Sequence, residues 1–593
     1  MKIHYILLLL GICYFSKSLR AQVSPTFGWG KTLGGSYYDE ASSVQQTTDG
    51  GYVVAGFSGS HNGDVTGNHL SKDFWVVKLS PDDSLVWETS LGGYATDAAS
   101  SIHQTADGGY IVAGYTSSVD GDILNNHGKE DVWIVKLDPN GEKLWQKALG
   151  GSENERCTSI AEMNNGNFIL GAYSSSSDGD LTSNSGGYDY WLISLNSAGD
   201  LLWQHSYGGS DTDLVYSAVH TSDGGYILAG TTYSTDGDVT ASFGGGDVWV
   251  VKTDSAGMLV WEKSYGGSLA EQGNAIIELN EGGFLITGIS YSSDGDVTGN
   301  HGLGDCWVLR LDTAGMLLWE NCFGSDHADG GNSLYQRNSN EFIVAGIASA
   351  SNGDVSGNHG LGDFWLFNLD SMGGLHWQQC YGGTKTESAF SVKPATNDGY
   401  IVAGYTKSND DDVTGNKGQY DYWVVKLCSG LLLFYPDDDG DSYGDTYDAG
   451  TLLCVAPSGF VADSTDCDDT DPFVNPAMLE IPGNGIDDNC NGYTDEFGVG
   501  TNDNYSGDSF SLFPNPADDE FRITMTLSSN ENFEVIISIQ SLSGQIYFAK
   551  AFSGFNGRLI KDIALDQKFS QGVYLVTVKT NSRCLNHLLT ICK

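Results

Sequence analysis

The sequence predicts an all-β protein: a seven-bladed β-propeller, then a small module poor in helix, then a C-terminal β-sandwich. Three observations support this prediction. Tryptophan recurs along most of the chain with one period, each period holds four strand-like runs, and alternating strand patterns return near the C-terminus.

The tryptophan period is 58 residues, as from Trp29 to Trp87, without an insertion or a deletion. All fourteen tryptophans belong to one of two series with this spacing: Trp29, Trp87, Trp145, Trp203, Trp261, Trp319 and Trp377, and Trp75, Trp133, Trp191, Trp249, Trp307, Trp365 and Trp423. Such regularity is typical of a repeat array. We expect the tryptophans to pack between repeats rather than to form a platform for an aromatic ligand.

One period, residues 97–150, illustrates the four runs. They are residues 100–104, 110–115, 132–137 and 143–149, separated by an Asp-Gly-Gly turn, a long polar loop and a Pro-Asn-Gly turn. Four antiparallel strands joined in this way form one propeller blade. The second run is apolar at nearly every position, which is typical of a strand buried on both faces.

The phase of the array predicts a closed ring. The array begins with a fourth-type run at Trp29 and ends with a third-type run at Leu427. We expect the two ends to share the seventh blade, with three strands from about residues 388 to 427 and the outermost from residues 27 to 33. Closure removes exposed sheet edges. An open solenoid would instead need capping repeats of different composition, which the sequence lacks.

The N-terminus and the charge indicate an exported protein. Lys2 precedes an apolar run, residues 5–15, that is too short to span a bilayer, and the small residue Ala21 precedes the expected cleavage point of a signal peptide. We therefore expect no membrane span in the mature chain. The formal net charge of −48 disfavours nucleic acid and anionic membranes as partners and favours divalent cations.

Three positions of the repeat are acidic in all seven copies. They begin the first strand (Asp39, Asp97, Glu155, Asp213, Glu271, Asp329, Glu387), lie in the long loop (Asp64, Asp122, Asp180, Asp238, Asp296, Asp354, Asp412), or precede the second tryptophan by two residues (Asp73, Asp131, Asp189, Asp247, Asp305, Asp363, Asp421). The simpler interpretation is that these carboxylates accept backbone hydrogen bonds. The alternative is a cation site in each loop, with Asp122 and Asp131 as ligands in the repeat that holds both. We also expect the loop and strand-start carboxylates to form one acidic face.

No catalytic residue is predicted. An active site usually requires one blade to depart from the others, whereas here every repeat has the same length, and GxSxG, HExxH and phosphate-binding loops are missing from the sequence. A glutamate at a strand start could pair with an aspartate for glycoside hydrolysis, but this position is acidic in every repeat. The loop histidines, one per blade at His69, His127, His301 and His359, do not suggest a shared metal. The symmetry favours multivalent binding over catalysis.

The segment after the array is acidic enough to require cations. It holds sixteen carboxylates between Asp437 and Glu496, and residues 429–500 contain no Lys or Arg. Oxygen donors on short glycine-containing loops are what calcium prefers. The candidate ligands are Asp437, Asp439, Asp441, Asp445, Asp466, Asp468, Asp469, Asp471, Asp487, Asp488, Asn491, Asp495 and Glu496. A solvated acidic linker is the alternative.

The order DxDGDxYGD, DCDDTDP, GIDDNCNG and DE within residues 435–496 resembles the MopE-like metal-binding module of secreted bacterial proteins. The resemblance implies calcium binding in a small, disulfide-assisted domain. Copper is associated with the family name, but the stretch has no His and no Met-rich set, and carboxylates argue against copper. The module has three cysteines, Cys454, Cys467 and Cys490, so that one of them is free to pair with Cys428 at the exit of the ring.

The C-terminal residues, taken alone, predict only a small β-sandwich. Pro514-Asn515-Pro516, the Ser543-Gly544 turn, and Gly572-Val573-Tyr574 before a final hairpin resemble the landmarks of the type IX secretion C-terminal sorting domain. The resemblance implies recognition by the type IX secretion machinery and passage across the outer membrane of a gram-negative bacterium. Release or attachment at the surface would follow.

The predicted organisation is a signal peptide (1–21), a propeller (22–428), a metal-binding module (429–497), a linker (498–508) and a sorting domain (509–593). The leading hypothesis is a secreted or cell-surface, calcium-binding, non-enzymatic protein whose propeller binds a glycan or a protein. The alternatives are a polysaccharide hydrolase or lyase with a propeller fold and a purely structural surface protein.

Overall fold

The computed structural model describes residues 24–494 and 509–591, with gaps at 455, 458, 480, 482–483, 514–516, 518–519, 527–532, 542–544, 555–557, 566–567 and 580–583. The predicted signal peptide, Asp495, Glu496 and the linker lie outside the described residues. Within them the regular elements are all strands, and no helix has the length and apolar character of a membrane span. The chain divides into two compact units: the residues up to Phe434 with Gly450–Ala462, and Tyr435–Ala449 with the residues from Asp463 onward.

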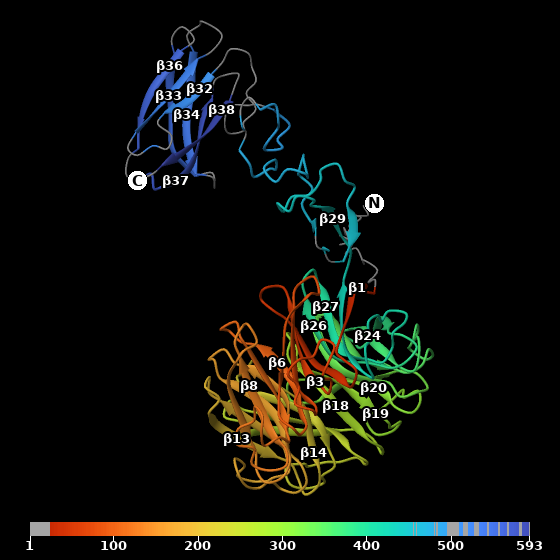
Figure 1. Ribbon diagram of the computed structural model, residues 1–593. Helices are drawn as coiled ribbons and strands as arrows, with labels where there is room; N and C mark the ends of the chain where they lie inside the picture. Colours follow the sequence, from red (N-terminus) through yellow and green to blue (C-terminus); the bar gives the residue numbers. More distant parts are fainter. Residues whose placement is uncertain are drawn as a thin grey trace, which may run out of the picture. The chain divides into compact units, whose positions relative to one another are not determined.

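The first unit contains seven four-stranded antiparallel sheets (Figure 1). Six of them use consecutive strands: β2 (Asp39–Gln46), β3 (Tyr52–Ser58), β4 (Asp73–Leu79) and β5 (Leu85–Leu91); β6 (Asp97–Gln104), β7 (Tyr110–Thr116), β8 (Asp131–Leu137) and β9 (Lys143–Leu149); β10 (Glu155–Glu162), β11 (Phe168–Ser174), β12 (Asp189–Leu195) and β13 (Leu201–Tyr207); β14 (Asp213–His220), β15 (Tyr226–Thr232), β16 (Asp247–Thr253) and β17 (Leu259–Tyr265); β18 (Glu271–Glu278), β19 (Phe284–Ser290), β20 (Asp305–Leu311) and β21 (Leu317–Phe323); β22 (Gly330–Asn338), β23 (Glu341–Ala348), β24 (Asp363–Asp370) and β25 (Leu375–Tyr381).

The seventh sheet closes the ring. It consists of β26 (Glu387–Ala395), β27 (Gly399–Thr406), β28 (Asp421–Cys428) and, as its outermost strand, β1 (Thr26–Leu33). β1 pairs antiparallel with β28 from Thr26 opposite Cys428 to Leu33 opposite Tyr422. In Figure 1 the red strand β1 accordingly lies among the teal strands of the last repeat. The predicted closure is confirmed.

The core of the ring lies between neighbouring sheets. One cluster of buried side chains joins Phe74 of the first sheet to Trp133 of the second, and the cluster at the closure joins Trp75 to Val424. The seven tryptophans of the second series are fully buried, and the indole N–H of Trp133 donates a hydrogen bond to Gln146 Oε1 at 2.8 Å. The interpretation of these tryptophans as packing residues is confirmed.

A short three-stranded sheet follows the ring, formed by β29 (Leu432–Pro436), β30 (Thr451–Leu453) and β31 (Phe460–Val461). A disulfide joins Cys428, the last residue of β28, to Cys454, directly after β30. The predicted pairing of Cys428 with a cysteine of the module is therefore confirmed.

The second unit ends in two packed antiparallel sheets. One contains β32 (Ser509–Phe513), β33 (Glu520–Thr526) and β36 (Arg558–Ala564), and the other contains β34 (Phe533–Ser541), β35 (Ile546–Gly554), β37 (Gly572–Lys579) and β38 (Cys584–Ile591). Side chains that alternate inward, such as Phe521, Ile537 and Val576, form one core between the sheets. The all-β fold class is confirmed for this part as well.

Candidate metal centre and channel mouth

Residues 437–443 form a tight acidic loop. Asp437 Oδ1 accepts hydrogen bonds from the backbone N–H groups of Gly440 at 2.8 Å and Asp441 at 3.1 Å, and Gly440 has a φ of 83°, which suits glycine. Asp439 Oδ1 also accepts a hydrogen bond from the Asp441 N–H, at 3.2 Å. Backbone donors therefore hold these alternate carboxylates in place.

A second acidic segment, residues 466–469, lies beside this loop. The backbone N–H of Asp466 donates a hydrogen bond to Gly444 O at 3.0 Å, and the backbone carbonyl of Asp466 accepts one from the Thr446 N–H at 2.8 Å. Two groups of carboxylates result, each with ligand atoms within 4.8 Å of one another: Asp437, Asp439 and Asp469, and Asp439, Asp441 and Asp466. Because Asp439 belongs to both groups, five carboxylates form one cluster, which we call the carboxylate cluster.

Two oxygens of the carboxylate cluster are buried without a hydrogen-bond partner among the described residues. They are Oδ2 of Asp439 and Oδ2 of Asp466, and the side chain of Asp466 is fully buried. Burial, together with the charges of Asp441, Asp439 and Asp469, raises the pKa of Asp466 to about 6. A buried acceptor without a donor is costly, so these orphaned oxygens fit a bound cation.

The structure places the other predicted ligands that it describes outside the carboxylate cluster. Asp488 is buried, but its carboxylate accepts hydrogen bonds from Asn484 Nδ2 at 2.9 Å and the Ile481 N–H at 2.8 Å. The rest bind nearby backbone or hydroxyl groups of their own loops: Asp445, Asp468, Asp471, Asp487 and Asn491. A disulfide joins Cys467 to Cys490, so their sulfurs do not act as thiolate ligands.

The repeated acids of the ring do not form the exposed acidic face predicted from the sequence. The strand-start carboxylates and those before the second tryptophan series are all buried, and only the loop series is partly exposed. In the second sheet, Asp97 Oδ2 accepts hydrogen bonds from the Gly93 N–H and Ser118 Oγ, both at 2.8 Å. The long loops cover the strand starts, so the prediction of an acidic face was wrong, whereas the simpler hydrogen-bonding interpretation is confirmed.

Asp122 and Asp131 lie at different junctions between blades. Asp122 accepts a hydrogen bond from the Gly92 N–H, beside the first sheet, at 3.2 Å. Asp131 instead lies beside Glu155 of the third sheet, because a Cβ on Gly150 would be 2.7 Å from Asp131 Oδ1 and 2.6 Å from Glu155 Oε2. The two residues therefore do not serve one loop site together.

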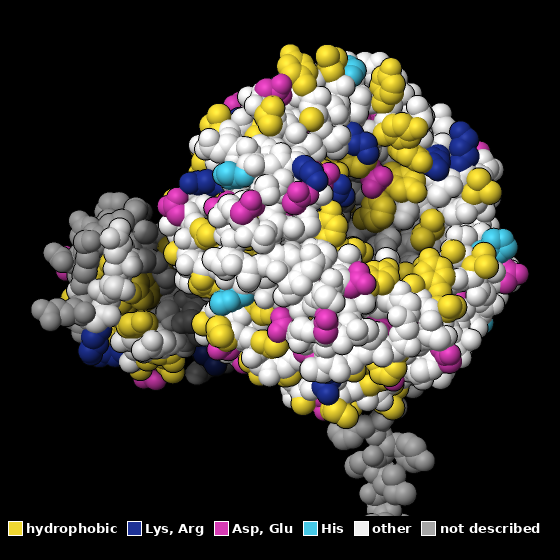
Figure 2. All heavy atoms as spheres, turned by 90° about the horizontal axis from the view of Figure 1, so that it is seen from below, with side chains coloured by type: hydrophobic (Ala, Val, Ile, Leu, Met, Phe, Trp, Pro, Cys, Tyr) yellow, Lys and Arg dark blue, Asp and Glu magenta, His cyan; other side chains and the backbone are white. Residues whose placement is uncertain are grey.

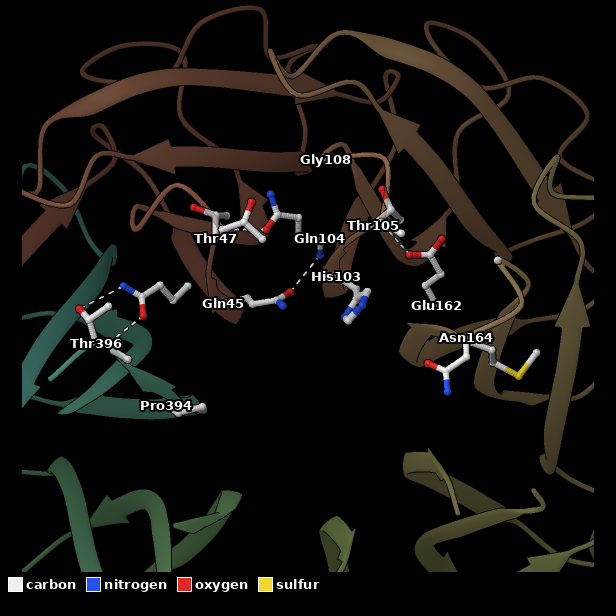
Figure 3. Close-up of a pocket in the computed structure, with 16 residues that line it drawn as sticks. Gln45, Thr47, His103, Gln104, Thr105, Gly108, Glu162, Asn164, Pro394 and Thr396 are labelled. Atoms are coloured by element: carbon white, nitrogen blue, oxygen red, sulfur yellow. Dashed lines mark hydrogen bonds between the residues drawn. The ribbon is translucent and has the colours of Figure 1, made fainter. Parts of the chain in front are cut away.

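Propeller blades surround a central channel, and Figure 2 shows a hollow near the centre of one face of the ring, bordered by hydrophobic side chains, by Lys or Arg and by Asp or Glu. Where the inner strands finish, a cavity of about 850 Å³ opens among the first, second, third and seventh sheets (Figure 3). We call it the channel mouth. Its lining contains one imidazole, one carboxylate and several amides and hydroxyls: His103, Glu162, and Gln45, Gln46, Thr47, Thr48, Gln104, Thr105, Asn164 and Thr396.

Hydrogen bonds across blade junctions fix several of these side chains. Gln45 Oε1 accepts from the Gln104 N–H and Gln104 Oε1 accepts from the Thr48 N–H, each at 2.9 Å. Glu162 Oε2 accepts from the Ala106 N–H at 2.7 Å. In Figure 3 Gln45 and His103 border the open centre.

Sequence reasoning missed the channel mouth, although the repeats carry its signal. The position of Val44 is apolar in every copy, as a buried strand position must be. The next position differs in every copy: Gln45, His103, Ala161, Val219, Ile277, Tyr335 and Lys393. Equal repeat length concealed this break in symmetry.

Two family models match the chain after the ring. Residues 466–496 match the Cu-binding MopE family, described as a metal-binding motif. Residues 511–591 match the family described as the secretion system C-terminal sorting domain. The chain carries a MopE-like metal-binding motif and a type IX sorting domain. The sorting domain indicates export to the cell surface or the extracellular space.

Among curated proteins, the regulatory protein FlaEY of Caulobacter vibrioides is 28% identical over 225 residues, which cover 34% of this chain and 23% of FlaEY. The chain thus spans less than a quarter of the length of this relative.

The solved structures that match the chain do so at low identity and low TM-score. A glycoside hydrolase is 10% identical with a TM-score of 0.22, over 71% of this chain and 93% of its own. A puromycin hydrolase is 11% identical with a TM-score of 0.34, over 71% of this chain and 64% of its own. PorZ, a surface component of the type IX secretion system of Porphyromonas gingivalis, is 9% identical with a TM-score of 0.18. This match covers 95% of this chain and 100% of PorZ. Scores this low carry no argument about function.

Proposed function

We propose that this chain is an exported binding protein in which the second unit binds calcium and the ring binds a glycan at the channel mouth. The observation that carries the first part is the pair of orphaned buried oxygens, Asp439 Oδ2 and Asp466 Oδ2, in the carboxylate cluster. The ligands would be Asp437, Asp439, Asp441, Asp466 and Asp469.

The donor set favours calcium over copper. All five groups are carboxylates, which are hard oxygen ligands, and copper prefers imidazole or sulfur donors. Residues 429–500 contain no His, and both cysteines near the cluster are held in a disulfide. Residues 429–500 contain no Lys or Arg that could neutralise these carboxylates. Bound calcium would neutralise them and would hold the loop of residues 437–443 against residues 466–469.

Calorimetry on the full chain, purified with a chelator, tests the calcium proposal. We expect heat of binding and a higher melting temperature when calcium is added. Asp466→Asn should weaken calcium binding about tenfold or more, because it removes a buried ligand charge. Asp468→Asn is the matched control, since Asp468 is exposed and outside the cluster. Equal effects of the two variants, or binding of copper but not calcium, would contradict the proposal.

The chemistry of the channel mouth supports a glycan as the ligand of the ring. Its amide and hydroxyl groups match the hydroxyl groups of a sugar, and cavities that bind small molecules combine concavity with a few fixed polar groups. We expect the labelled full chain to bind members of a glycan array in the presence of calcium. Binding to no glycan would refute this part, and selective capture of a peptide on a parallel peptide array would favour the protein alternative.

A further inference from the structure

The channel is two-sided at the level of Gln45. Three consecutive sheets, the third to the fifth, contribute the apolar residues Ala161, Val219 and Ile277 at this position. The other four contribute polar residues, among them His103 and Lys393. Ala161, Val219 and Ile277 pack against the buried clusters between neighbouring sheets. We call the side formed by the four polar residues the polar wall.

The polar wall carries two basic side chains without partners. Neither Lys393 nor His103 makes a hydrogen bond or an ion pair with any residue in the described part of the chain. Lys393 is exposed and directly precedes Pro394, which lines the channel mouth, and desolvation lowers the pKa of its ammonium. The chain has 28 basic and 76 acidic residues, so an uncompensated ammonium is unusual here.

Two amide groups add further donors to this wall. The side-chain oxygens of Gln45 and Gln104 each accept a hydrogen bond from a backbone N–H group, as described above. These hydrogen bonds fix the orientation of both amides. Their NH₂ groups have no acceptor among the described residues. Donors held in place in this way favour a ligand rich in acceptors, because little ordering is needed on binding.

One acidic group opposes an anion at the channel mouth. Burial lowers the pKa of His103; the charge of Glu162 acts in the opposite direction and the charge of Lys393 in the same direction. However, Glu162 Oε2 is held by the Ala106 N–H at 2.7 Å, on the side of the blade junction (Figure 3). The free donors of Lys393, Gln45 and Gln104 therefore outnumber the single opposing carboxylate.

We propose that the channel mouth binds an acidic sugar of the uronic-acid type. The carboxylate would lie against the amides of Gln45 and Gln104, which line the cavity, and against Lys393, which directly precedes the lining residue Pro394. The C–H face of the sugar ring would pack on Met163 and Pro394, which are also part of the lining. This inference rests on the proposed glycan-binding function and names the class of sugar.

Isothermal titration of the full chain in calcium buffer tests this inference, with glucuronate and galacturonate as probes and glucose, galactose and acetate as controls. We expect a uronate to bind. The neutral sugars should bind at least about tenfold more weakly, because they lack the charge-assisted hydrogen bonds. Acetate that binds as well as the uronates would overturn the inference, because the site would then not recognise a sugar.

Variants connect binding to the channel. Lys393→Met should weaken uronate binding about tenfold, and Asn164→Asp, which adds a carboxylate to the exposed lining of the channel mouth, should also weaken it. Lys147→Met is the matched control, since Lys147 pairs with Asp200 on an exposed surface. Unchanged affinity in both channel variants would refute the inference. If the array detects only neutral glycans, the inference fails and the proposed function stands; if it detects no glycan, both fail.

Discussion

Asp39 and Asp421 face each other at the junction that closes the ring. A Cβ on Gly34 would be 2.5 Å from Asp39 Oδ2 and 2.8 Å from Asp421 Oδ1, and both carboxylates are fully buried. Burial, with the charges of Asp39 and Asp64, raises the pKa of Asp421 to about 7, although a backbone hydrogen bond from Lys417 and its charge lower it. Asp421 Oδ1 has no donor among the described residues.

The raised pKa of Asp421 predicts that the ring loses stability as the pH rises from about 4 to 8. Asp73, Asp189 and Asp363 have pKa values raised to about 6 by burial and act in the same direction. The folded chain holds these protons where the unfolded chain releases them, so the free energy of unfolding falls through this range. We expect a lower melting temperature at pH 8 than at pH 5.5 in chelator-treated samples.

Asp421→Asn tests this explanation. The amide can still accept the Lys417 N–H through its oxygen and can donate to Asp39. It should stabilise the chain at pH 8 by on the order of 2–4 kcal/mol and reduce the loss of stability with pH. Asp211→Asn, at an exposed position in another blade, is the control and should change little. A pH profile in Asp421→Asn identical to that of the original chain would contradict the assignment.

At the scale of elements, the disulfide between Cys428 and Cys454 constrains the end of the closing sheet. The two cysteines are 26 residues apart, and Cys428 ends β28, which pairs with β1. A cross-link over a loop of this length restricts the unfolded chain and contributes about 3 kcal/mol in the chain-entropy model. We therefore expect Cys428→Ser with Cys454→Ser to lower the melting temperature.

Urea unfolding followed by tryptophan fluorescence measures this effect, because all fourteen tryptophans lie in the repeat array. Replacing Cys467 and Cys490 together is the comparison, since that bond lies in the second unit. An equal loss of fluorescence-detected stability in the two double variants would show that the bond at Cys428 has no special role in the ring.

Elements that depend on local pattern could be predicted from the sequence, and long-range pairings only in part. The blade strands and the closure by residues 27–33 follow from periodicity and phase, because each strand repeats the same alternation. The cluster of Asp439 with Asp466 depends on two loops meeting across 27 residues, which spacing does not specify. The buried strand starts were misjudged because the charge of an aspartate does not reveal the loop that covers it.

At the scale of the whole molecule, the ring, the carboxylate cluster and the sorting domain carry separate tasks in one chain. Hydrophobic contacts between neighbouring sheets hold the ring, whereas the second unit has its own core in the sandwich. The ring therefore does not depend on the sandwich for its packing, and export can be tested without disturbing the propeller.

Deletion of residues 511–591 should prevent export. The sorting domain matched over these residues implies recognition by the type IX secretion machinery, so the truncated chain should remain inside the outer membrane while its ring stays folded. Immunoblots of surface, medium and periplasmic fractions from a type IX-competent bacterium measure its location. Protease resistance of the ring in the truncated chain is the control for folding, and a reporter fused to residues 509–593 should reach the surface or the medium. Undiminished export of the truncated chain would show that the sorting domain is not the signal that the machinery requires.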